Sequence, residues 1–376
     1  MTSFKLFSVQ GIDIKVHITF PLILVWAAFQ FGFLGQPGFS LNGAAFGVVV
    51  TLLLFVCVVI HELSHSLTST WMGYPVKDIV LLPLGGVSQI EEMPEGAGEE
   101  LLMAVAGPLS NVVIAFLLGL LSLFTPTSLL AGLRKIAADP MSLGWEDTLP
   151  YLVLTNLALA AFNLIPAFPM DGGRVLRSLL ATVMPQTQAT DVAVRIGQGF
   201  AWLLGLGGLL TGNLVWILIA IFVYAGAAQE GRMTRIRGIL EGMKVRQAFS
   251  RNVQTVSPTD PVSRAADLTL ESFQADFPVC NEGRIVGILS HTDIIRALQQ
   301  REPDTPVREV MKTDFPTLRL DDGLFEVHQH MQQSGLDALP VIEDDQFAGL
   351  LTSRDVNEAY QLLSINRELR KQLQNV

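Results

Sequence analysis

The sequence predicts a polytopic α-helical membrane protein, with six transmembrane helices, that carries an α/β domain at its C-terminal end. Half of the 376 residues are hydrophobic, and only 16% are charged. The charge is uneven, because residues 1–243 hold 11 Lys/Arg and 15 Asp/Glu whereas the shorter segment 244–376 holds 14 and 20. The later segment also repeats itself at a constant spacing of 62 residues. A membrane part followed by an acidic, duplicated soluble part is therefore expected.

The composition also excludes some partners and some covalent structure. The formal net charge of −10 argues against nucleic acid, because phosphate binding needs a basic surface. Cys57 and Cys280 are the only cysteines, and they lie on opposite sides of the expected boundary, so no disulfide framework is expected. This is compatible with a reducing cytoplasm. The first residues lack the basic-then-apolar layout of a signal peptide, so no cleavage is expected.

Apolar runs near spanning length define the membrane part. They occupy residues 18–35, 43–65, 100–125, 150–166, 193–210 and 213–229. The last two runs are separated only by Thr211, Gly212 and Asn213, so a tight helical hairpin is expected there. An even number of spans places both termini on the same side of the lipid bilayer.

Loop charges then choose the side on which the termini lie. Only Arg134 and Lys135 would fall on one face. The opposite face would carry nine basic residues: Lys5, Lys15, Lys77, Arg174, Arg177, Arg195, Arg232, Arg235 and Arg237. The positive-inside rule makes the basic face cytoplasmic. We therefore expect a multi-pass protein of the cell membrane with both termini in the cytoplasm.

The second apolar run ends in His61-Glu62-Leu63-Ser64-His65, which has the H-E-x-x-H spacing. On a helix, histidines at i and i+4 share one face, so both imidazoles can reach one metal ion with Glu62 beside it as general base. Ionisable groups on a spanning helix cost roughly 2.5–3.5 kcal/mol each on insertion scales, and they indicate a functional site by default. The alternative is that these residues only mark the helix end at the headgroups.

A catalytic zinc ion needs a third protein ligand and an open position, and Asp171 is the candidate. It is the only acidic residue between Asp147 and Asp191. His61 lies 18 residues from the outer end of its run, roughly 27 Å along a helix. Asp171 lies 21 residues beyond Pro150, roughly 31 Å if the segment is helical and somewhat less if its prolines break the helix. The two depths agree, and nearby prolines and glycines indicate irregular backbone around a protein-lined cavity. The alternative is an ordinary Asp-Gly turn at a helix end.

These motifs resemble the site-2 protease family of intramembrane zinc metalloproteases, over residues 1–243. Three elements carry the resemblance: His61-Glu62-x-x-His65, Asn163…Pro166…Pro169…Asp171-Gly172-Gly173 and Gly107-Pro108-x-x-Asn111. The resemblance implies that His61, His65 and Asp171 hold one Zn²⁺ ion. It also implies that Glu62 activates the attacking water and that Asn163 lies near the substrate carbonyl.

The same resemblance implies how a substrate would bind. Tyr74–Ile90, which contains Gly85 and Gly86, would form a membrane-associated hairpin. The edge strand of that hairpin would pair with an unwound transmembrane segment of a substrate protein, since a helical peptide bond is shielded. Asn111 is grouped with the two glycines as an expected substrate contact. The alternative for this segment is a plain glycine-containing turn between strands.

The soluble part is an internal repeat. Residues 245–298 and 307–360 align without gaps. Matching positions include Thr255/Thr317, Asp260/Asp322, Pro278/Pro340, Gly287/Gly349 and Asp293/Asp355. A repeat of about this length indicates one duplicated folding unit. Each copy is expected to contain short apolar strands followed by a helix.

The repeat resembles a tandem pair of CBS domains, at residues 244–302 and 303–364, followed by a polar tail at 365–376. Two segments match the adenosine-site pattern of that family: Gly287-x-x-Ser290-x-x-Asp293 and Gly349-x-x-Thr352-x-x-Asp355. An adenine nucleotide is implied, with ribose hydroxyls donating to Asp293 and Asp355 and with Ser290 and Thr352 near phosphate. Two alternatives remain, namely that the carboxylates cap helices and that the pair serves only for dimerisation or packing.

The combined prediction is an intramembrane zinc metalloprotease that cuts membrane-protein substrates and is regulated through its CBS pair. CBS pairs commonly associate face to face, so a homodimer is expected. A CBS-gated transporter or channel would fit the spans and the CBS pair, but it does not explain metal-ligand residue types at matched depth with a general base between two of them. An inactive scaffold would keep the fold without the chemistry, yet every expected catalytic residue is present.

Overall fold

The structure, a computed structural model, describes residues 3–33, 38–83, 85–90, 96–125, 128–139, 143–272, 274–300, 304–344 and 346–365. The chain divides into two compact units, Met1–Arg232 and Met233–Val376. The boundary expected from the sequence, after residue 243, lies slightly further along the chain than this division. Apart from Ile365, the expected polar tail lies outside the described residues.

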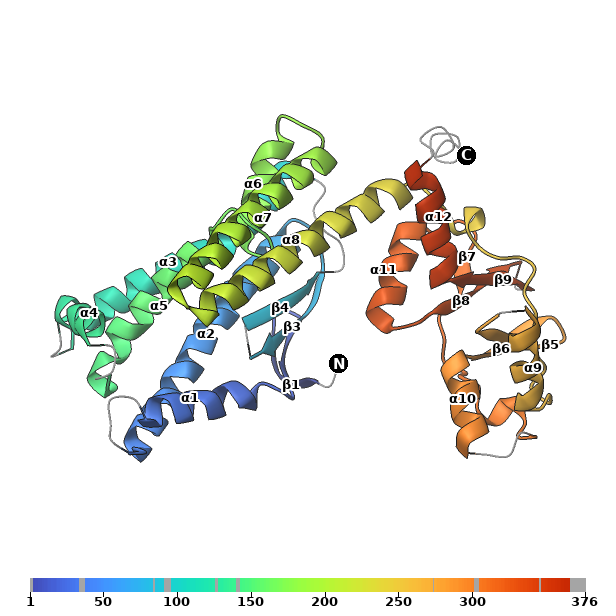
Figure 1. The fold of residues 1–376 in the computed structure, drawn as a ribbon, viewed down its shortest axis with the longest axis horizontal. Coiled ribbons are helices and arrows are strands. Elements are labelled where there is room, and N and C mark those ends of the chain that lie inside the picture. Colours follow the sequence, from blue (N-terminus) through green and yellow to red (C-terminus); the bar gives the residue numbers. More distant parts are fainter. Residues whose placement is uncertain are drawn as a thin grey trace. The chain divides into compact units, whose positions relative to one another are not determined.

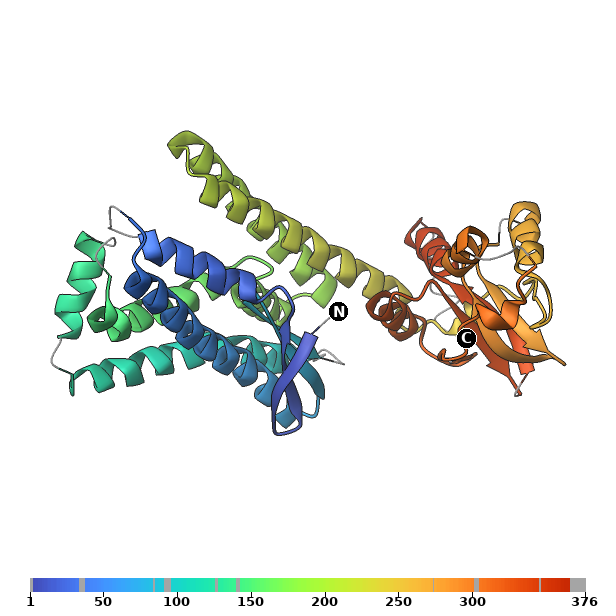
Figure 2. The same cartoon turned by 90° about the horizontal axis from the view of Figure 1, so that it is seen from below.

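The first unit is mainly helical (Figures 1 and 2). Its helices are α1 (Pro21–Phe33), α2 (Leu41–Trp71), α3 (Ala97–Ser122), α4 (Leu129–Ala138), α5 (Thr148–Asn163), α6 (Asp171–Ala181) and α7 (Gln186–Thr211), with the short turn η1 (Trp145–Asp147) before α5. Helix α8 (Leu214–Leu240) starts in this unit, and its residues from Met233 onward belong to the second unit. Helix α1 packs along α2, and α3 packs against α2, α5 and α6. This packing brings the second apolar run next to the chain around Asp171.

Four helices of the described chain are long and apolar enough to cross a membrane: α2, α3, α7 and α8. The expected count of six spans is therefore not confirmed. The first expected span corresponds to α1, with 13 residues, and the fourth to α5, with 16, whereas a spanning helix needs roughly 17–25. Helix α5 ends before Pro166, which would remove a helical hydrogen bond. The expected hairpin of the last two spans is present, with Gly212 left-handed at φ +68°.

A four-stranded sheet lies beside α2. Its order is β1 (Ser3–Val9), β2 (Ile12–His17), β3 (Val76–Leu82) and β4 (Gly85–Ile90). Strands β2 and β3 are parallel, and the other neighbours are antiparallel. Buried Ile12, Ile79 and Leu81 pack with Phe55 of α2, so the sheet shares a core with the helix that carries the metal motif. The expected hairpin is present as β3 and β4, whereas the N-terminal hairpin was not foreseen.

The second unit contains the duplicated elements. They are η2 (Val245–Gln247), α9 (Val262–Ser272), β5 (Phe277–Asn281), β6 (Arg284–Leu289) and α10 (His291–Gln300), then η3 (Val307–Glu309), β7 (Leu318–Arg319), α11 (Leu324–Ser334), β8 (Ala338–Glu343), β9 (Gln346–Thr352) and α12 (Ser353–Ile365). The expected strand-strand-helix order occurs twice, as β5–β6–α10 and β8–β9–α12. Each half has its own buried cluster.

The two halves exchange their first residues. Val245, which opens the first repeat, is buried in the core of the second half, and Val307, which opens the second repeat, is buried in the core of the first. The backbone repeats this symmetry, because Val245 N donates to Asp322 O and Val307 N donates to Asp260 O, at 3.0 and 2.9 Å. The folding unit is therefore the pair, although the sequence repeat suggests two separate copies.

Candidate functional site

Helix α2 presents the two histidines of the H-E-x-x-H motif on one face. The helix has 31 residues and starts at Ser40, whose side chain accepts a hydrogen bond from Gly43 N at 3.2 Å. His61 and His65 lie one turn apart and are 6% and 9% exposed. Their Nε2 atoms are 3.2 Å from each other. Both imidazoles therefore point at the same place, as the i, i+4 spacing predicts.

Asp171 reaches the same place from the first residue of α6. Between Asn163 and Asp171 the chain is not helical, and its backbone lies directly on the first turn of α6. A Cβ at Gly172 would lie 2.2 Å from Ile165 O, and a Cβ at Gly173 would lie 2.6 Å from Phe168 N. Only glycine fits at both positions, and this close approach holds the carboxylate of Asp171 at the entrance of the helix.

The three ligand atoms form a triangle of nearly equal edges. Asp171 Oδ2 lies 3.3 Å from His61 Nε2 and 3.2 Å from His65 Nε2, which closes the triangle with the 3.2 Å between the two imidazoles. Two atoms that each lie 2.0–2.1 Å from a tetrahedral zinc ion are roughly 3.3–3.4 Å apart. Within the described residues, this trio is the single group of three or more His, Cys, Asp or Glu side chains arranged to hold a metal. The donor set and its spacing fit zinc.

Helix α3 shapes the other side of this centre. The carbonyl oxygen of Met103 lies 2.7 Å from His65 Nδ1 and so fixes the orientation of that ring with Nε2 toward the centre. A Cβ at Gly107 would lie 2.2 Å from His65 Nε2 and 2.7 Å from His61 Cε1. Gly107 is therefore required for space, since any side chain would occupy the position where the ligand atoms converge.

Glu62 is held from the sheet. Its Oε2 accepts a hydrogen bond of 2.8 Å from Ser88 Oγ on β4. Ser66, one turn later on α2, donates to the carbonyl oxygen of Glu62 at 2.9 Å and lies 3.3 Å from Ser88 Oγ. Gly86, on the same face of β4 as Ser88, would place a Cβ 2.5 Å from Glu62 Cγ. The strand therefore packs directly on the carboxylate next to the metal ligands.

The other expected residues of the membrane part occupy different positions. Asn111, one turn after Gly107 on α3, is 1% exposed, and its Oδ1 has no hydrogen-bond partner among the described residues. Asn163 ends α5 and is half-buried, without a hydrogen bond to any described side chain. Gly85 opens β4 with φ +142°, a conformation that favours glycine. The structure thus brings Gly86 to Glu62 but shows no contact of Asn163 with the metal ligands.

Comparison with known proteins identifies the family of this chain. Peptidase family M50 matches residues 49–204, and the CBS domain matches residues 245–300 and 307–362. Zinc metalloprotease MJ0392 of Methanocaldococcus jannaschii is 32% identical over 369 residues, which cover 98% of this chain and 99% of that protein. The chain belongs to peptidase family M50. The resemblances to site-2 proteases and to tandem CBS domains are thereby confirmed.

Two further relatives extend the comparison of this M50 protein. Stage IV sporulation protein FB of Bacillus subtilis is 27% identical over 197 residues, covering 50% of this chain and 62% of that protein. The solved structure of a site-2 protease from Methanocaldococcus jannaschii is 38% identical and covers 61% of this chain and 96% of that chain, with a TM-score of 0.45.

A buried ion cluster fastens the M50 helix that carries Asp171. Arg177 of α6 pairs with Glu100 of α3 and with Glu230 of α8, and its guanidinium lies 5.1 Å from the ring centre of Phe168. Arg177 and Glu100 are 6% and 4% exposed. In the topology argument Arg177 counts as a loop charge, but the structure places it inside a helix with two carboxylates. Its partners are 77 and 53 residues away, so local sequence gives no signal of the cluster.

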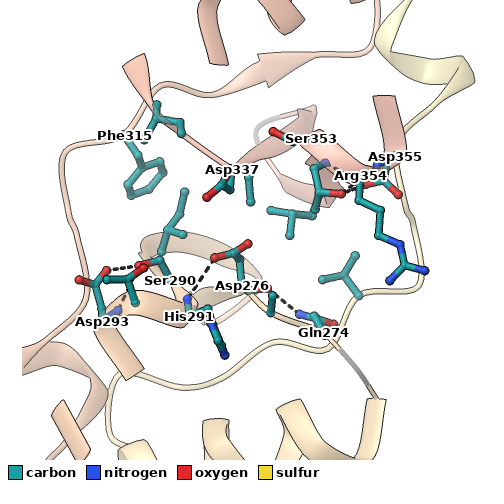
Figure 3. Close-up of a pocket in the computed structure, with 18 of the residues that line it drawn as sticks. Gln274, Asp276, Ser290, His291, Asp293, Phe315, Asp337, Ser353, Arg354 and Asp355 are labelled. Carbon is teal, nitrogen blue, oxygen red and sulfur yellow. Dashed lines mark hydrogen bonds between the residues drawn. The ribbon is translucent and has the colours of Figure 1, made fainter. Parts of the chain in front are cut away.

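The CBS pair contains a pocket of about 760 Å³ (Figure 3). Ser290, Asp293, Thr352 and Asp355 all line it, as expected from the adenosine-site pattern. The pocket also has basic side chains at its walls: Arg296, Lys312 and Arg354. Charge of both signs therefore faces one cavity that is shared by the two repeats.

The expected ribose carboxylates already have partners, both at the starts of their own helices and elsewhere: Ser250 Oγ donates to Asp355 Oδ1 at 2.9 Å, and Lys312 Nζ lies 3.7 Å from Asp293 Oδ2. Thr352 N donates to Asp355 Oδ2 at 2.8 Å, and Asp355 N donates to Thr352 Oγ1 at 3.1 Å, which together form a capping box. At the other helix, Asp293 N donates to Ser290 Oγ at 3.3 Å, and the Ser290 hydroxyl donates to Asp293 Oδ2 at 2.5 Å. The helix caps are therefore the hydroxyl residues, and the aspartates lie at the third helical position. The alternative that the aspartates themselves cap the helices is therefore wrong, because Ser290 and Thr352 occupy the capping positions.

One pocket residue was missed from the sequence. Asp276 precedes β5 and points into the pocket, where its Oδ1 accepts a hydrogen bond of 3.2 Å from His291 N. Burial raises the pKa of this carboxyl above its usual value, and the nearby carboxylate of Asp337 adds to the rise. The aligned position in the second repeat is Ala338, so the repeat alignment gave no signal at Asp276.

Proposed function

We propose that this M50 protein is an intramembrane zinc endopeptidase that hydrolyses peptide bonds within or near the transmembrane segments of other proteins. The observation that carries the proposal is the convergence of His61 Nε2, His65 Nε2 and Asp171 Oδ2 with edges of 3.2–3.3 Å. Three protein ligands leave the fourth position of a tetrahedral ion for water or substrate, as in catalytic rather than structural zinc sites.

His61, His65 and Asp171 would hold the zinc ion. When bound, zinc supplies Lewis acidity, which polarises the scissile carbonyl and makes water easier to deprotonate. Glu62 accepts the proton of the attacking water as its oxygen adds to the carbonyl carbon. Glu62 then donates this proton to the nitrogen of the leaving amine as the carbon-nitrogen bond breaks. Because Ser88 occupies Oε2, the other carboxylate oxygen of Glu62 is the one available for this transfer.

Strand β4 is the proposed docking edge for the substrate. It pairs with β3 on one side, and no described strand pairs with its other side. A substrate segment that adds to this edge would leave its helical conformation and would be fixed in register by main-chain hydrogen bonds. Gly85 and Gly86 keep the start of that edge free of side chains. Asn111 and Asn163 remain proposed contacts of the substrate chain.

The decisive experiment replaces Glu62 by Gln. The full-length Glu62→Gln protein should bind one zinc ion per chain and should cut a transmembrane model substrate at least about 1,000-fold more slowly, because no group is left to accept the proton. Metal content and cleavage are measured on the same preparation, with and without a chelator. Glu99→Gln is a matched control, because Glu99 lies in the first turn of α3 and hydrogen-bonds Tyr74.

The outcomes separate the rival functions. An active Glu62→Gln protein refutes the assigned base. A wild-type protein that binds zinc without cleaving any substrate favours the inactive scaffold, and one that binds no zinc favours the transporter or channel. The proposed orientation, with both termini in the cytoplasm, predicts that residues of the CBS pair are labelled only from that side.

We further propose that the CBS pair binds an adenine nucleotide and thereby regulates cleavage. The specific observation is that the adenosine-pattern residues of both repeats line one pocket of about 760 Å³. Titration of ATP, AMP and adenosine by calorimetry should show binding that Asp293→Ala or Asp355→Ala weakens by about tenfold, since each substitution removes a charged acceptor. Cleavage rates that do not change across the titration would refute regulation. Sedimentation of the full chain tests the proposed homodimer.

A further inference from the structure

Ser88 of β4 contacts the carboxylate of Glu62 on the neighbouring helix α2. Ser88 lies on the edge strand β4, opposite Ile79 of β3. Its neighbour Val87 is 50% exposed, whereas Ser88 is half-buried, so the strand turns Ser88 toward α2. The hydroxyl of Ser88 donates to Glu62 Oε2 at 2.8 Å. The two residues come from different elements, 26 positions apart, and meet beside the metal ligands.

The residues around the hydrogen bond between Ser88 and Glu62 leave room for it and support it. Residues 86 and 88 face α2 together because strand side chains alternate. Gly86 has no side chain, which lets the strand backbone approach Glu62, where a Cβ would lie 2.5 Å from Cγ. Ser66 is completely buried, and its hydroxyl lies 3.3 Å from Ser88 Oγ. Ser88 therefore holds one oxygen of the carboxylate, Ser66 lies beside Ser88, and Gly86 leaves room for the Glu62 side chain.

We propose that Ser88 is a positioning residue that holds Glu62 in the rotamer needed for proton transfer, and that the substrate-binding strand itself supplies this restraint. This inference rests on the proposed role of Glu62 as the base. A glutamate side chain has several freely rotating bonds, and a hydrogen bond to its charged oxygen removes alternatives. Since β4 also offers the free edge, the strand that would fix the register of the substrate also fixes the base. Ser88 therefore links the position of the bound substrate strand to the position of the Glu62 carboxylate.

The inference predicts a specific kinetic signature for Ser88→Ala in the full-length, zinc-loaded protein. The value of kcat should fall about 10- to 100-fold, the range expected when a hydrogen bond to a charged group is lost. KM for a transmembrane model substrate should stay within about twofold, because the β4 backbone is unchanged, and bound zinc should remain at one per chain. Ser88→Thr retains the hydroxyl and should recover most of kcat.

Ser64→Ala is the matched control. Ser64 is also half-buried near the motif, but its hydroxyl donates to the carbonyl of Ile60 at 2.7 Å and does not contact the Glu62 carboxylate. Its kcat should remain within about twofold of wild type. The inference is overturned if Ser88→Ala keeps wild-type kcat, if it loses zinc or thermal stability in proportion to its activity, or if Ser64→Ala loses as much kcat.

The two proposals fail in different ways. If Glu62→Gln is active, the role of the base is wrong and the inference about Ser88 falls with it. If Glu62→Gln is inactive while Ser88→Ala is fully active, the base stands and only the positioning role is refuted.

Discussion

The metal centre of the first unit and the pocket of the CBS pair both gather polar side chains, but they satisfy them differently. At the metal centre, α2 supplies two imidazoles and α6 supplies a carboxylate, and the carboxylate oxygen lies 3.2–3.3 Å from the imidazole nitrogens. In the CBS pocket, Asp355 accepts a hydrogen bond from Thr352, just before its own helix, and another of 2.9 Å from Ser250. The first arrangement fits a cation held between the groups, whereas in the second each carboxylate already has hydrogen-bond donors from the protein.

The difference shows how strongly each geometry supports a ligand. Two imidazoles and a carboxylate in buried surroundings have a strict spacing, and few other groups would fit between them. A pocket whose acidic residues are bonded locally can accept a ligand only by sharing or replacing those bonds. The zinc proposal therefore stands on the coordinates of three atoms, whereas the nucleotide proposal stands on a sequence pattern and a cavity.

The largest expected effect concerns the metal centre. Gly107→Ala should abolish both zinc binding and cleavage, because the new Cβ would lie 2.2 Å from His65 Nε2. Metal analysis of the purified protein checks this. Gly119→Ala is the matched change on the same helix, where a Cβ meets only Leu129 Cδ2 at 3.7 Å. If Gly107→Ala binds zinc like Gly119→Ala, the described arrangement of the two imidazoles is wrong.

An intermediate effect, on stability, is expected at the ion cluster that joins α6 to α3 and α8. Arg177→Met should lower the free energy of unfolding by about 3–5 kcal/mol, because it leaves the carboxylates of Glu100 and Glu230 near one another without their cation. Thermal unfolding in detergent, followed by circular dichroism, measures the loss. Arg195→Met, an exposed arginine of α7, should change stability by less than about 0.5 kcal/mol. Equal effects of both substitutions would show that the ion cluster contributes nothing specific.

The smallest expected effect concerns the CBS pocket and depends on pH. The pKa of Asp276 is raised in the folded protein, so the unfolded chain loses its proton first as pH rises from about 4. Stability contributed by the protonated carboxyl is complete below that pH and is lost as pH rises through the raised pKa. Asp276→Asn should therefore be more stable than wild type at pH 8 and similar to it below pH 4. A stability difference that does not vary with pH contradicts this.

The sequence predicts those features that depend on local spacing. His61 and His65 share a face because of helical periodicity, and the strands around Gly85 and Gly86 form the expected hairpin. The depth estimate also pairs Asp171 with the histidines, although the chain from Pro150 is helical only as far as Asn163 and resumes a helix at Asp171. The shared face of the two histidines is the firmer prediction, because it uses distances within one helix.

Features that depend on which elements meet could not be predicted in the same way. The parallel pairing of β2 with β3 joins residues such as Asp13 and Asp78, which are far apart in the sequence. The turn at Gln10 and Gly11 joins β1 to β2 but gives no indication that β3 is the next strand of the sheet. Ser88 looks like any strand serine until α2 is placed beside it. Arg177 looks like a loop charge until α3 and α8 surround it. The length of α5 was overestimated because apolar residues continue past the helix end at Asn163.

The exchange of Val245 and Val307 between the two CBS halves limits how the molecule can be dissected. A truncation between the repeats would deprive both fragments of a buried valine and of the main-chain bonds that accompany it. Neither half is a module that can be removed alone. Any test of what the soluble part does to proteolysis should delete or transplant the pair as a single piece.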